Sequence, residues 1–173
     1  MDLLDKFSKI KLLVFDMDGV LTNGKLLIHP DGNWLREMDI KDGYALRMAQ
    51  QMGFTVAVVS GSNSAPVEQR LNYLGINRVY QNVKNKSVVI ESLMKDLSVQ
   101  KEEILFMGDD IPDLLAFHVV GLPTCPSDAS SDVLSASVYI SPRKGGEGCV
   151  RDVIEKVLKS QNKWKMDNLT SST

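Results

Sequence analysis

The segment that most constrains the fold is a run of four apolar residues, 12–15, followed by two aspartates. No polar residue interrupts Leu-Leu-Val-Phe, which is typical of a central parallel strand buried on both faces. Asp16 and Asp18 follow, and open α/β sheets bind ligands at this carboxyl end of their strands. Strand alternation would point the two side chains to opposite faces unless the chain bends after Asp16, which Gly19 would permit. A solvated acidic turn is the alternative that this segment leaves open.

Length and composition favour an ordinary globular protein. The 173 residues fit one domain, and the formal net charge of −2 gives no electrostatic reason to expect nucleic acid or an anionic membrane as a partner. No apolar run approaches the ~20 residues of a membrane span, and residues 1–11 lack a signal-peptide core. We therefore expect a cytoplasmic protein. Cys125 and Cys149 lack ligand-like spacing, so we expect reduced thiols rather than a disulfide or a metal site.

Apolar runs and helical stripes alternate along the chain, which predicts an α/β fold with a mainly parallel sheet and no second domain. A polar, loose tail is expected from about residue 161. Asp42 is expected to cap the first of the long helices. After the first strand, the predicted strands are 54–59, 78–81, 104–107, 122–124 and 138–140, and the predicted helices are 43–52, 64–74, 87–97, 111–120 and 148–158.

Residues 24–38 predict a β-hairpin inserted after the first strand. Two short runs flank Pro-Asp-Gly-Asn at 30–33, a sequence that favours a turn. Leu27, Trp34, Leu35 and Met38 have no obvious cover within such a hairpin, and exposed strand edges are usually paired or buried. This favours an oligomer contact over a hairpin folded onto its own domain.

Three of the predicted strands end in small or acidic residues, and parallel strands bring these ends to one edge. The ends are Asp16 with Asp18, Ser60 with Gly61, and Gly108 with Asp109 and Asp110. Converging carboxylates repel one another unless a cation lies between them, and Mg²⁺ takes oxygen ligands and binds phosphate substrates. An aspartate can attack phosphorus, and a second can serve as acid and base. Ser60 and Lys86 would add the donors that a phosphoryl group requires, although a turn serine and a solvated lysine are the simpler interpretations.

These motifs, in this order, resemble the haloacid dehalogenase superfamily of phosphatases. Residues 16–22 match its first motif, Ser60-Gly61 the second, Lys86 the third and residues 108–113 the fourth. The resemblance implies a Rossmann-like fold in which Asp16 is the nucleophile and Asp18 the general acid and base. It also implies Mg²⁺ held by Asp16, the main-chain carbonyl of Asp18 and Asp109, supported by Asp110 and Asp113.

A finer resemblance, over residues 8 to about 164, is to the 3-deoxy-D-manno-octulosonate 8-phosphate phosphatases. The short connection after Gly61 leaves no room for a cap domain, as in that family. The family forms tetramers in which the hairpin and a C-terminal segment, here 145–148, help to close a neighbour's site. The resemblance implies that the substrate-binding residues include Asp18, Lys41, Asp42, Gly43, Arg47, Gly61, Arg70 and Lys86.

Three positions depart from that family's pattern. Ser62 stands where arginine is common, Asp39 where asparagine is usual and Glu147 where a basic residue is frequent. Each makes the pocket less cationic, although Lys41, Arg47 and Arg70 remain available for the substrate's carboxylate. Related enzymes that hydrolyse nine-carbon ulosonate 9-phosphates share the scaffold, so the sugar remains open.

Two other kinds of function use similar residues. Response-regulator phospho-acceptor domains also combine acids, Mg²⁺, Ser or Thr and Lys, but Asp18 would supply a base that activates water against a stable acyl-phosphate. A non-catalytic subunit that keeps the fold for assembly is the remaining alternative. Every catalytic position is intact, which favours the phosphatase.

Overall fold

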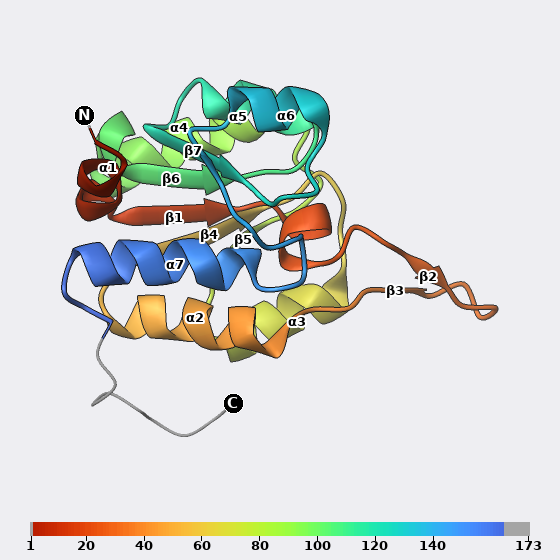
Figure 1. The fold of residues 1–173 in the computed structure, drawn as a ribbon. Helices are drawn as coiled ribbons and strands as arrows, with labels where there is room; N and C mark the ends of the chain where they lie inside the picture. Colours follow the sequence, from red (N-terminus) through yellow and green to blue (C-terminus); the bar gives the residue numbers. More distant parts are fainter. Residues whose placement is uncertain (1, 165–173) are drawn as a thin grey trace.

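The computed structural model describes residues 2–164, in which six strands form one parallel sheet (Figure 1). The first strand of the chain lies inside the sheet, between the strands whose ends carry Ser60 and Asp109, as its apolar sequence predicts. In spatial order the strands are β5 (Arg78–Tyr80), β4 (Thr55–Val59), β1 (Leu12–Phe15), β6 (Ile104–Met107), β7 (Leu122–Cys125) and β8 (Tyr139–Ile140).

Helices cover both faces of this sheet, which confirms the predicted α/β class (Figure 1). Side chains of β1 alternate between the two layers: Leu13 and Phe15 join one apolar core, while Leu12 and Val14 join the other. One face carries α2 (Ile40–Gln51), α3 (Ala65–Tyr73) and α7 (Cys149–Ser160), with α1 (Leu3–Lys9) against α7; the other carries α4 (Lys86–Leu97), α5 (Leu114–Phe117) and α6 (Ser131–Ala136). Only residues 60–64 connect β4 to α3, so no cap domain is inserted there, as predicted.

Two helices were not predicted and one is shorter than predicted. The unpredicted helices are α1 and α6, each of which spans only about two turns and offers too few positions for a periodic apolar stripe. The helix predicted over 111–120 is instead a 3₁₀ turn, η3 (Ile111–Asp113), followed by α5. The His118 carbonyl accepts a hydrogen bond from Lys101 Nζ, and Gly121 N–H donates to the Lys101 carbonyl, so the chain turns towards η2 (Lys101–Glu103).

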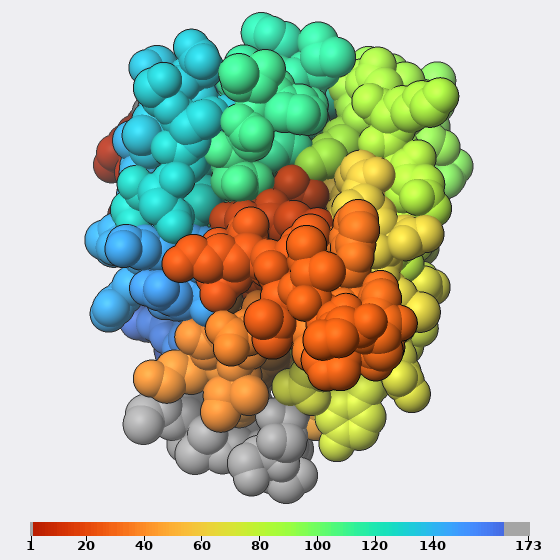
Figure 2. All heavy atoms as spheres, turned by 90° about the vertical axis from the view of Figure 1, so that its right-hand side faces the viewer, coloured from red at the N-terminus to blue at the C-terminus, as the bar shows by residue number. Residues whose placement is uncertain are grey.

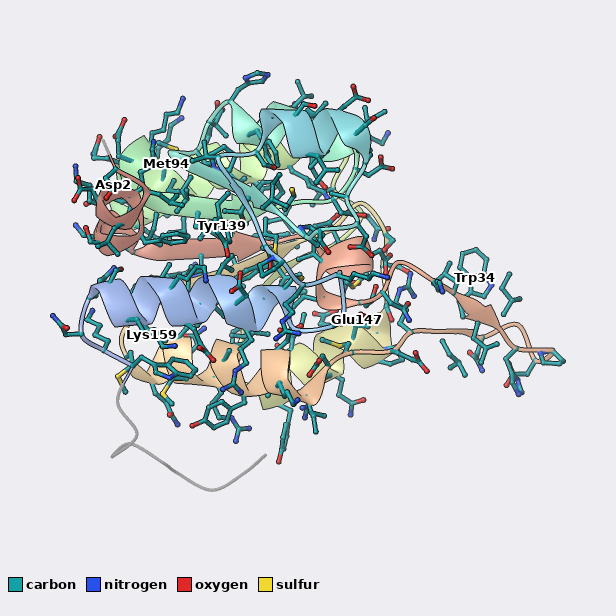
Figure 3. The ribbon with its side chains drawn as sticks, viewed as in Figure 1. Asp2, Trp34, Met94, Tyr139, Glu147 and Lys159 are labelled. Carbon is teal, nitrogen blue, oxygen red and sulfur yellow. The ribbon has the colours of Figure 1, made fainter. Side chains whose placement is uncertain are left out.

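The hairpin is present and projects from the edge of the molecule (Figure 1). Its strands, β2 (Leu27–Ile28) and β3 (Trp34–Leu35), are antiparallel, and a bridge between Thr22 and Met38 joins its base. Figure 2 views the molecule from the side on which this segment, in orange, stands in front of the body. Trp34 is 59% exposed and lies far from the sheet (Figure 3), so the apolar side chains of β2 and β3 have no cover from the described residues. Met38, at the base of the hairpin, was expected to lack cover but packs against the core.

The chain beyond α7 begins differently from the prediction of a loose tail. Gln161 Nε2 donates to the carbonyls of Ile10 and Phe7, and Trp164 packs against the core on the α7 side. These contacts fix residues 161–164 to the body, and the remainder of the predicted tail lies outside the described residues. Within residues 2–164, no helix combines the length and the apolar character needed to cross a bilayer.

Candidate active site

The chain bends where β1 ends. Asp16 N–H still donates to the Met107 carbonyl of β6 at 2.9 Å, so Asp16 is the last residue tied to the sheet. The chain then coils through η1 (Met17–Leu21), in which Gly19 has a φ of +83°, a conformation that favours glycine. A side chain at Gly19 would overlap the Asp109 carboxylate, so this glycine also permits the close approach of the two loops.

Asp113 organises the loop that follows β6. Its Oδ2 accepts hydrogen bonds from the main-chain N–H of Asp109 at 2.9 Å and of Asp110 at 3.3 Å. Asp110 is exposed, and its Oδ1 caps η3 by accepting from Ile111 N–H at 2.8 Å. Asp113 therefore holds the backbone that carries Asp109, and Asp110 caps the 3₁₀ turn that follows it.

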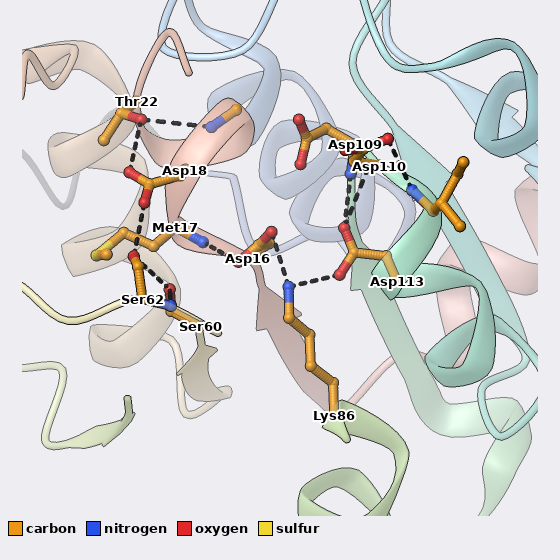
Figure 4. A network of polar contacts seen from close by, with 12 residues as sticks. Asp16, Met17, Asp18, Thr22, Ser60, Ser62, Lys86, Asp109, Asp110 and Asp113 are labelled. Carbon is orange, nitrogen blue, oxygen red and sulfur yellow. Dashed lines mark hydrogen bonds and ion pairs between the residues drawn. The ribbon is translucent and has the colours of Figure 1, made fainter. Parts of the chain in front are cut away.

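Lys86 lies between two buried carboxylates. It is the first residue of α4, its side chain is 7% exposed, and its Nζ lies 2.7 Å from Asp16 Oδ2 and 2.5 Å from Asp113 Oδ1 (Figure 4). The other oxygen of Asp16 accepts from Met17 N–H at 2.6 Å. Asp16 and Lys86, which belong to two separate sequence motifs, are thus in direct contact, although they come from different strand–helix units.

The carboxylates of Asp16, Asp109 and Asp113 form one acidic cluster, with an oxygen of each within 4.8 Å of the others. Burial, reinforced by the charge of Asp113 and opposed by Lys86, raises the pKa of Asp16 to about 7. Burial and the charges of Asp16 and Asp113 raise the pKa of Asp109 to about 8. Burial therefore disfavours the charged forms of these two carboxylates, and the neighbouring aspartates add to the effect.

The donor set of this cluster fits a hard divalent cation. Carboxylate oxygens on separate loops, gathered at one point and partly buried, are ligands that Mg²⁺ accepts. A bound cation would stabilise the charged carboxylates against the burial and the mutual repulsion that raise the two pKa values. Asp16 and Asp109 would hold such an ion, and Asp113 already holds the loop of Asp109.

The side chain of Asp18 does not belong to that cluster, which corrects the expectation that Asp16, Asp18 and Asp109 converge side by side. The bend at Gly19 turns it towards Arg36, Ser62 and Thr22 instead. Arg36 binds both carboxylate oxygens, and Ser62 Oγ donates to Oδ2 at 2.6 Å. Burial raises the pKa of Asp18, but these hydrogen bonds outweigh it and the net pKa is lowered.

A cavity of about 290 Å³ opens over these residues. Ser60 is buried at the end of β4, its N–H donates to the Tyr80 carbonyl at 2.8 Å, and its Oγ lies 3.2 Å from Ser62 Oγ. The walls come from four loops that follow β1, β4, β5 and β6. The lining residues include Asp16, Asp18, Ser60, Gly61, Ser62, Lys84, Lys86, Asp109, Asp110 and Asp113.

The other predicted substrate residues do not line this cavity. Arg47 and Arg70 both lie against the ring of exposed Tyr73, and Arg47 Nη2 also donates to the Tyr73 carbonyl at 3.1 Å. Gly43 is buried, facing Arg70 and α3. The positions flagged as departures, other than Ser62, lie in a second, charged cleft of about 400 Å³, lined by Asp39, Lys41, Arg143, Glu147, Gly148, Arg151, Asp152 and Glu155.

Asp42 is buried and, contrary to the prediction, does not cap the first long helix, α2. The cap of α2 is Asp39, whose Oδ1 accepts from Lys41 N–H at 2.6 Å. Asp42 lies one turn further on, and its Oδ1 accepts from Arg151 N–H at 2.7 Å, in the first turn of α7. It thereby satisfies an otherwise unpaired donor of α7, whose N-cap residue, Gly148, provides no side-chain hydrogen bond.

The burial of Asp42 should make the free energy of unfolding depend on pH. Burial, with the charge of Asp39 adding and Arg151 opposing, raises the pKa of Asp42 from 3.8 to about 7. A raised pKa means that its contribution to stability is full below about pH 4 and is lost as pH rises through about 7. The free energy of unfolding of Asp42→Asn relative to wild type should therefore increase by roughly 2 kcal/mol between pH 5 and pH 8.

Denaturant unfolding at both pH values measures this difference. Asp132→Asn, an exposed position in α6, is the matched control and should show the same offset at both. An Asp42→Asn offset that does not change with pH would contradict an ionisable, buried Asp42.

Sequence reasoning missed the partners of Asp18. Arg36 lies 18 residues from Asp18 in the hairpin, and no motif or periodicity distinguishes it from a solvated arginine. Ser62 stands where the resembling family often has arginine, and its sequence position gives no sign that its hydroxyl donates a hydrogen bond to Asp18. The signal that could have found Arg36 is its place at the foot of a hairpin inserted directly after Asp18.

Comparison with known proteins gives concordant matches. Residues 39–121 match the family model of haloacid dehalogenase-like hydrolases. The chain is 33% identical over 162 residues to the 3-deoxy-D-manno-octulosonate 8-phosphate phosphatase KdsC of Escherichia coli K12, covering 94% of this chain and 86% of that protein.

Solved structures agree with these sequence matches. The Yersinia pestis 3-deoxy-D-manno-octulosonate 8-phosphate phosphatase superposes with a TM-score of 0.91 at 32% identity, over 93% of this chain and 87% of that chain. The Moraxella catarrhalis phosphatase of the same name, solved with magnesium, phosphate and KDO, gives a TM-score of 0.89 at 32% identity, over 92% and 91% of the chains.

Proposed function

The chain belongs to the haloacid dehalogenase-like hydrolases and is a phosphoric monoester hydrolase, and we propose that it acts on 3-deoxy-D-manno-octulosonate 8-phosphate with Mg²⁺. The observation that carries the proposal is the contact between Asp16 and Lys86 beside Asp109, at the mouth of a cavity fit for a small anion. A nucleophilic carboxylate, a fixed cation and a metal-ligand set in one place are what phosphoryl transfer requires.

In the proposed reaction, Asp16 attacks phosphorus and the chain passes through an aspartyl-phosphate. A bond forms between an Asp16 oxygen and phosphorus while the bond from phosphorus to the sugar oxygen breaks, and the protonated form of Asp18 gives that oxygen its proton. Because the hydrogen bonds to Asp18 lower its pKa, only the fraction of molecules with a protonated Asp18 carries out this step. Asp18 then takes a proton from water, which attacks phosphorus and frees Asp16 and inorganic phosphate. Lys86 and the donors of Ser60 and Gly61 bind the phosphoryl oxygens throughout.

Mg²⁺ would supply positive charge against the charge that develops on the transferred group. We propose that it is held by the side chains of Asp16 and Asp109 and the main-chain carbonyl of Asp18. Asp113 has a different role in this scheme, because its two oxygens are already bound by Lys86 and by the loop that carries Asp109. It would position both groups without contacting the substrate, and Asp110 would keep the same loop in place.

The choice of sugar is tested by phosphate release from eight-carbon and nine-carbon ulosonate phosphates. We expect kcat/KM for 3-deoxy-D-manno-octulosonate 8-phosphate to exceed that for nine-carbon 9-phosphates by at least about tenfold, because the same site would have to accommodate one added carbon and its hydroxyl. Chelation of the metal should abolish release, and added Mg²⁺ should restore it. A preference for the nine-carbon compounds would contradict the proposed substrate but leave the proposed mechanism unchanged. Full activity under chelation would contradict the proposed requirement for Mg²⁺.

We also propose that the enzyme is a homotetramer whose subunits complete one another's sites. Two observations support this: nothing among residues 2–164 covers the apolar side chains of β2 and β3, and Lys41, Arg47 and Arg70 do not line the cavity of their own chain. Segment 145–148, by contrast, contacts its own chain, because Gly146 N–H donates to the Val20 carbonyl at 2.9 Å. The mass of the purified protein in solution tests the assembly.

The cellular role follows from the proposed substrate. Removal of its phosphate would serve lipopolysaccharide sugar synthesis in the cytoplasm. The two cysteines, Cys125 and Cys149, are buried and unpaired with one another, which is compatible with a reducing compartment.

A further inference from the structure

One side chain of the hairpin, that of Arg36, contacts the active site of its own chain. Arg36 follows β3, and its Nε lies 2.7 Å from Asp18 Oδ1 while its Nη2 lies 3.1 Å from Asp18 Oδ2. The Arg36 side chain is only 6% exposed, in contrast to the apolar residues further along the same hairpin. Two parallel hydrogen bonds from a planar guanidinium fix the plane of a carboxylate as well as its position.

Arg36 differs in this respect from the other partners of Asp18. Ser62 Oγ donates one hydrogen bond to Oδ2, and Thr22 Oγ1 donates a longer one, 3.4 Å, to Oδ1. Each hydroxyl can rotate and each contacts one oxygen, so neither fixes the carboxylate plane. Only Arg36, among the partners described, holds both oxygens at once.

The base of the hairpin is built to keep Arg36 in this place. A bridge between Thr22 and Met38 joins the two sides of the hairpin at its base, two residues from Arg36. Asn23 Nδ2 also donates to Glu37 Oε2 at 3.3 Å, next to Arg36. Arg36 does not line the cavity that holds Asp16, whereas Asp18 does. Any effect of Arg36 on the reaction should therefore pass through Asp18 rather than through the substrate.

We propose that Arg36 is a positioning residue that fixes the Asp18 carboxylate, so that turnover depends on how the hairpin is seated on its own chain. The proposal rests on the phosphatase function described above. It adds a role for the hairpin within one subunit, separate from any contact with a neighbour. A displacement of Asp18 by about an ångström is enough to slow catalysis by roughly 100-fold.

The experiment compares Arg36→Gln and Arg36→Lys with the matched control Lys25→Gln, which removes an exposed cation from the same hairpin. With Mg²⁺ and 3-deoxy-D-manno-octulosonate 8-phosphate, Arg36→Gln should lower kcat by about 10- to 100-fold and leave KM within about threefold. Arg36→Lys should recover part of kcat, because one charged hydrogen bond remains possible. Lys25→Gln should keep kcat within about twofold, and all three variants should keep the wild-type melting temperature to within a few degrees.

The outcomes separate this inference from the function beneath it. If wild type releases no phosphate from any ulosonate phosphate, the proposed function fails. If wild type is active, the inference fails on any of three results: an unchanged kcat in Arg36→Gln, a rise in KM alone, or an equal loss in Lys25→Gln. If Arg36→Gln is unfolded, Arg36→Lys decides, and a folded Arg36→Lys with wild-type kcat overturns the inference.

Discussion

Asp16→Asn is expected to lower the rate of phosphate release by at least about 10⁴-fold, because the amide oxygen is a poor nucleophile and cannot form the aspartyl-phosphate. The same change should leave the fold intact or stabilise it. Asp16 lies in a buried cluster of carboxylates that raises its pKa, so removing its charge relieves repulsion with Asp113. Steady-state phosphate release measures the first effect, and thermal unfolding measures the second.

Asp96→Asn is the matched control for this substitution. Asp96 is exposed in α4, far along the helix from Lys86, and its replacement makes the same chemical change outside the site. The control should retain activity within about twofold. An Asp16→Asn protein that is folded and releases phosphate at more than a few per cent of the wild-type rate would exclude Asp16 as the nucleophile.

Lys86→Met is expected to damage both catalysis and stability. Methionine keeps the length of the side chain but removes the charge between Asp16 and Asp113, leaving two buried carboxylates without their cation. Loss of one partner from a buried, hydrogen-bonded ion pair costs about 3 kcal/mol of stability. Activity should fall by at least about 100-fold, since the cation that binds the phosphoryl oxygens is also lost.

Denaturant unfolding and phosphate release, both measured in Mg²⁺, test these two effects together. Lys95→Met, near the exposed end of the same helix, is the control. It should change the free energy of unfolding by no more than about 0.5 kcal/mol and the rate of phosphate release by no more than about twofold. A stable and active Lys86→Met enzyme would show that Lys86 is a surplus charge. Lys86→Arg distinguishes charge from fit, because the guanidinium keeps the charge but is too large for the position between two buried carboxylates.

The positions of Asp16 and Asp109 could be predicted from the sequence because each follows a buried apolar run. In a parallel sheet the place of a residue just after such a run is fixed by the strand itself, and β1 and β6 are direct neighbours. No contact between distant residues has to be guessed. Lys86 is the other case that sequence could reach, because the same logic puts the first turn of α4 close to this edge.

The direction of Asp18 could not be predicted in the same way. It depends on the backbone conformation at Gly19 and on partners 18 and 44 residues away, Arg36 and Ser62. Alternation along a strand says nothing once the chain has left the strand. Asp113 joins the acidic cluster for a similar reason, since a 3₁₀ turn rather than a regular helix carries it back towards Lys86.

Asp42 shows how a local pattern is overruled by packing. An acidic residue before a helical stripe is a good cap by propensity, but the residue that caps α2 lies three positions earlier, at Asp39. Asp42 is then carried inwards and its Oδ1 accepts from Arg151 N–H of α7. Such a pairing joins helices that are about a hundred residues apart in the chain, and no local signal in the sequence marks it.

The most direct test of the account is rapid acid quenching of wild-type enzyme that is turning over 3-deoxy-D-manno-octulosonate 8-phosphate labelled in its phosphate, followed by peptide mapping. The account predicts label on the peptide containing Asp16, formed within one turnover and absent from Asp16→Asn. Rapid phosphate release with no labelled protein, or label on a residue other than Asp16, would contradict it.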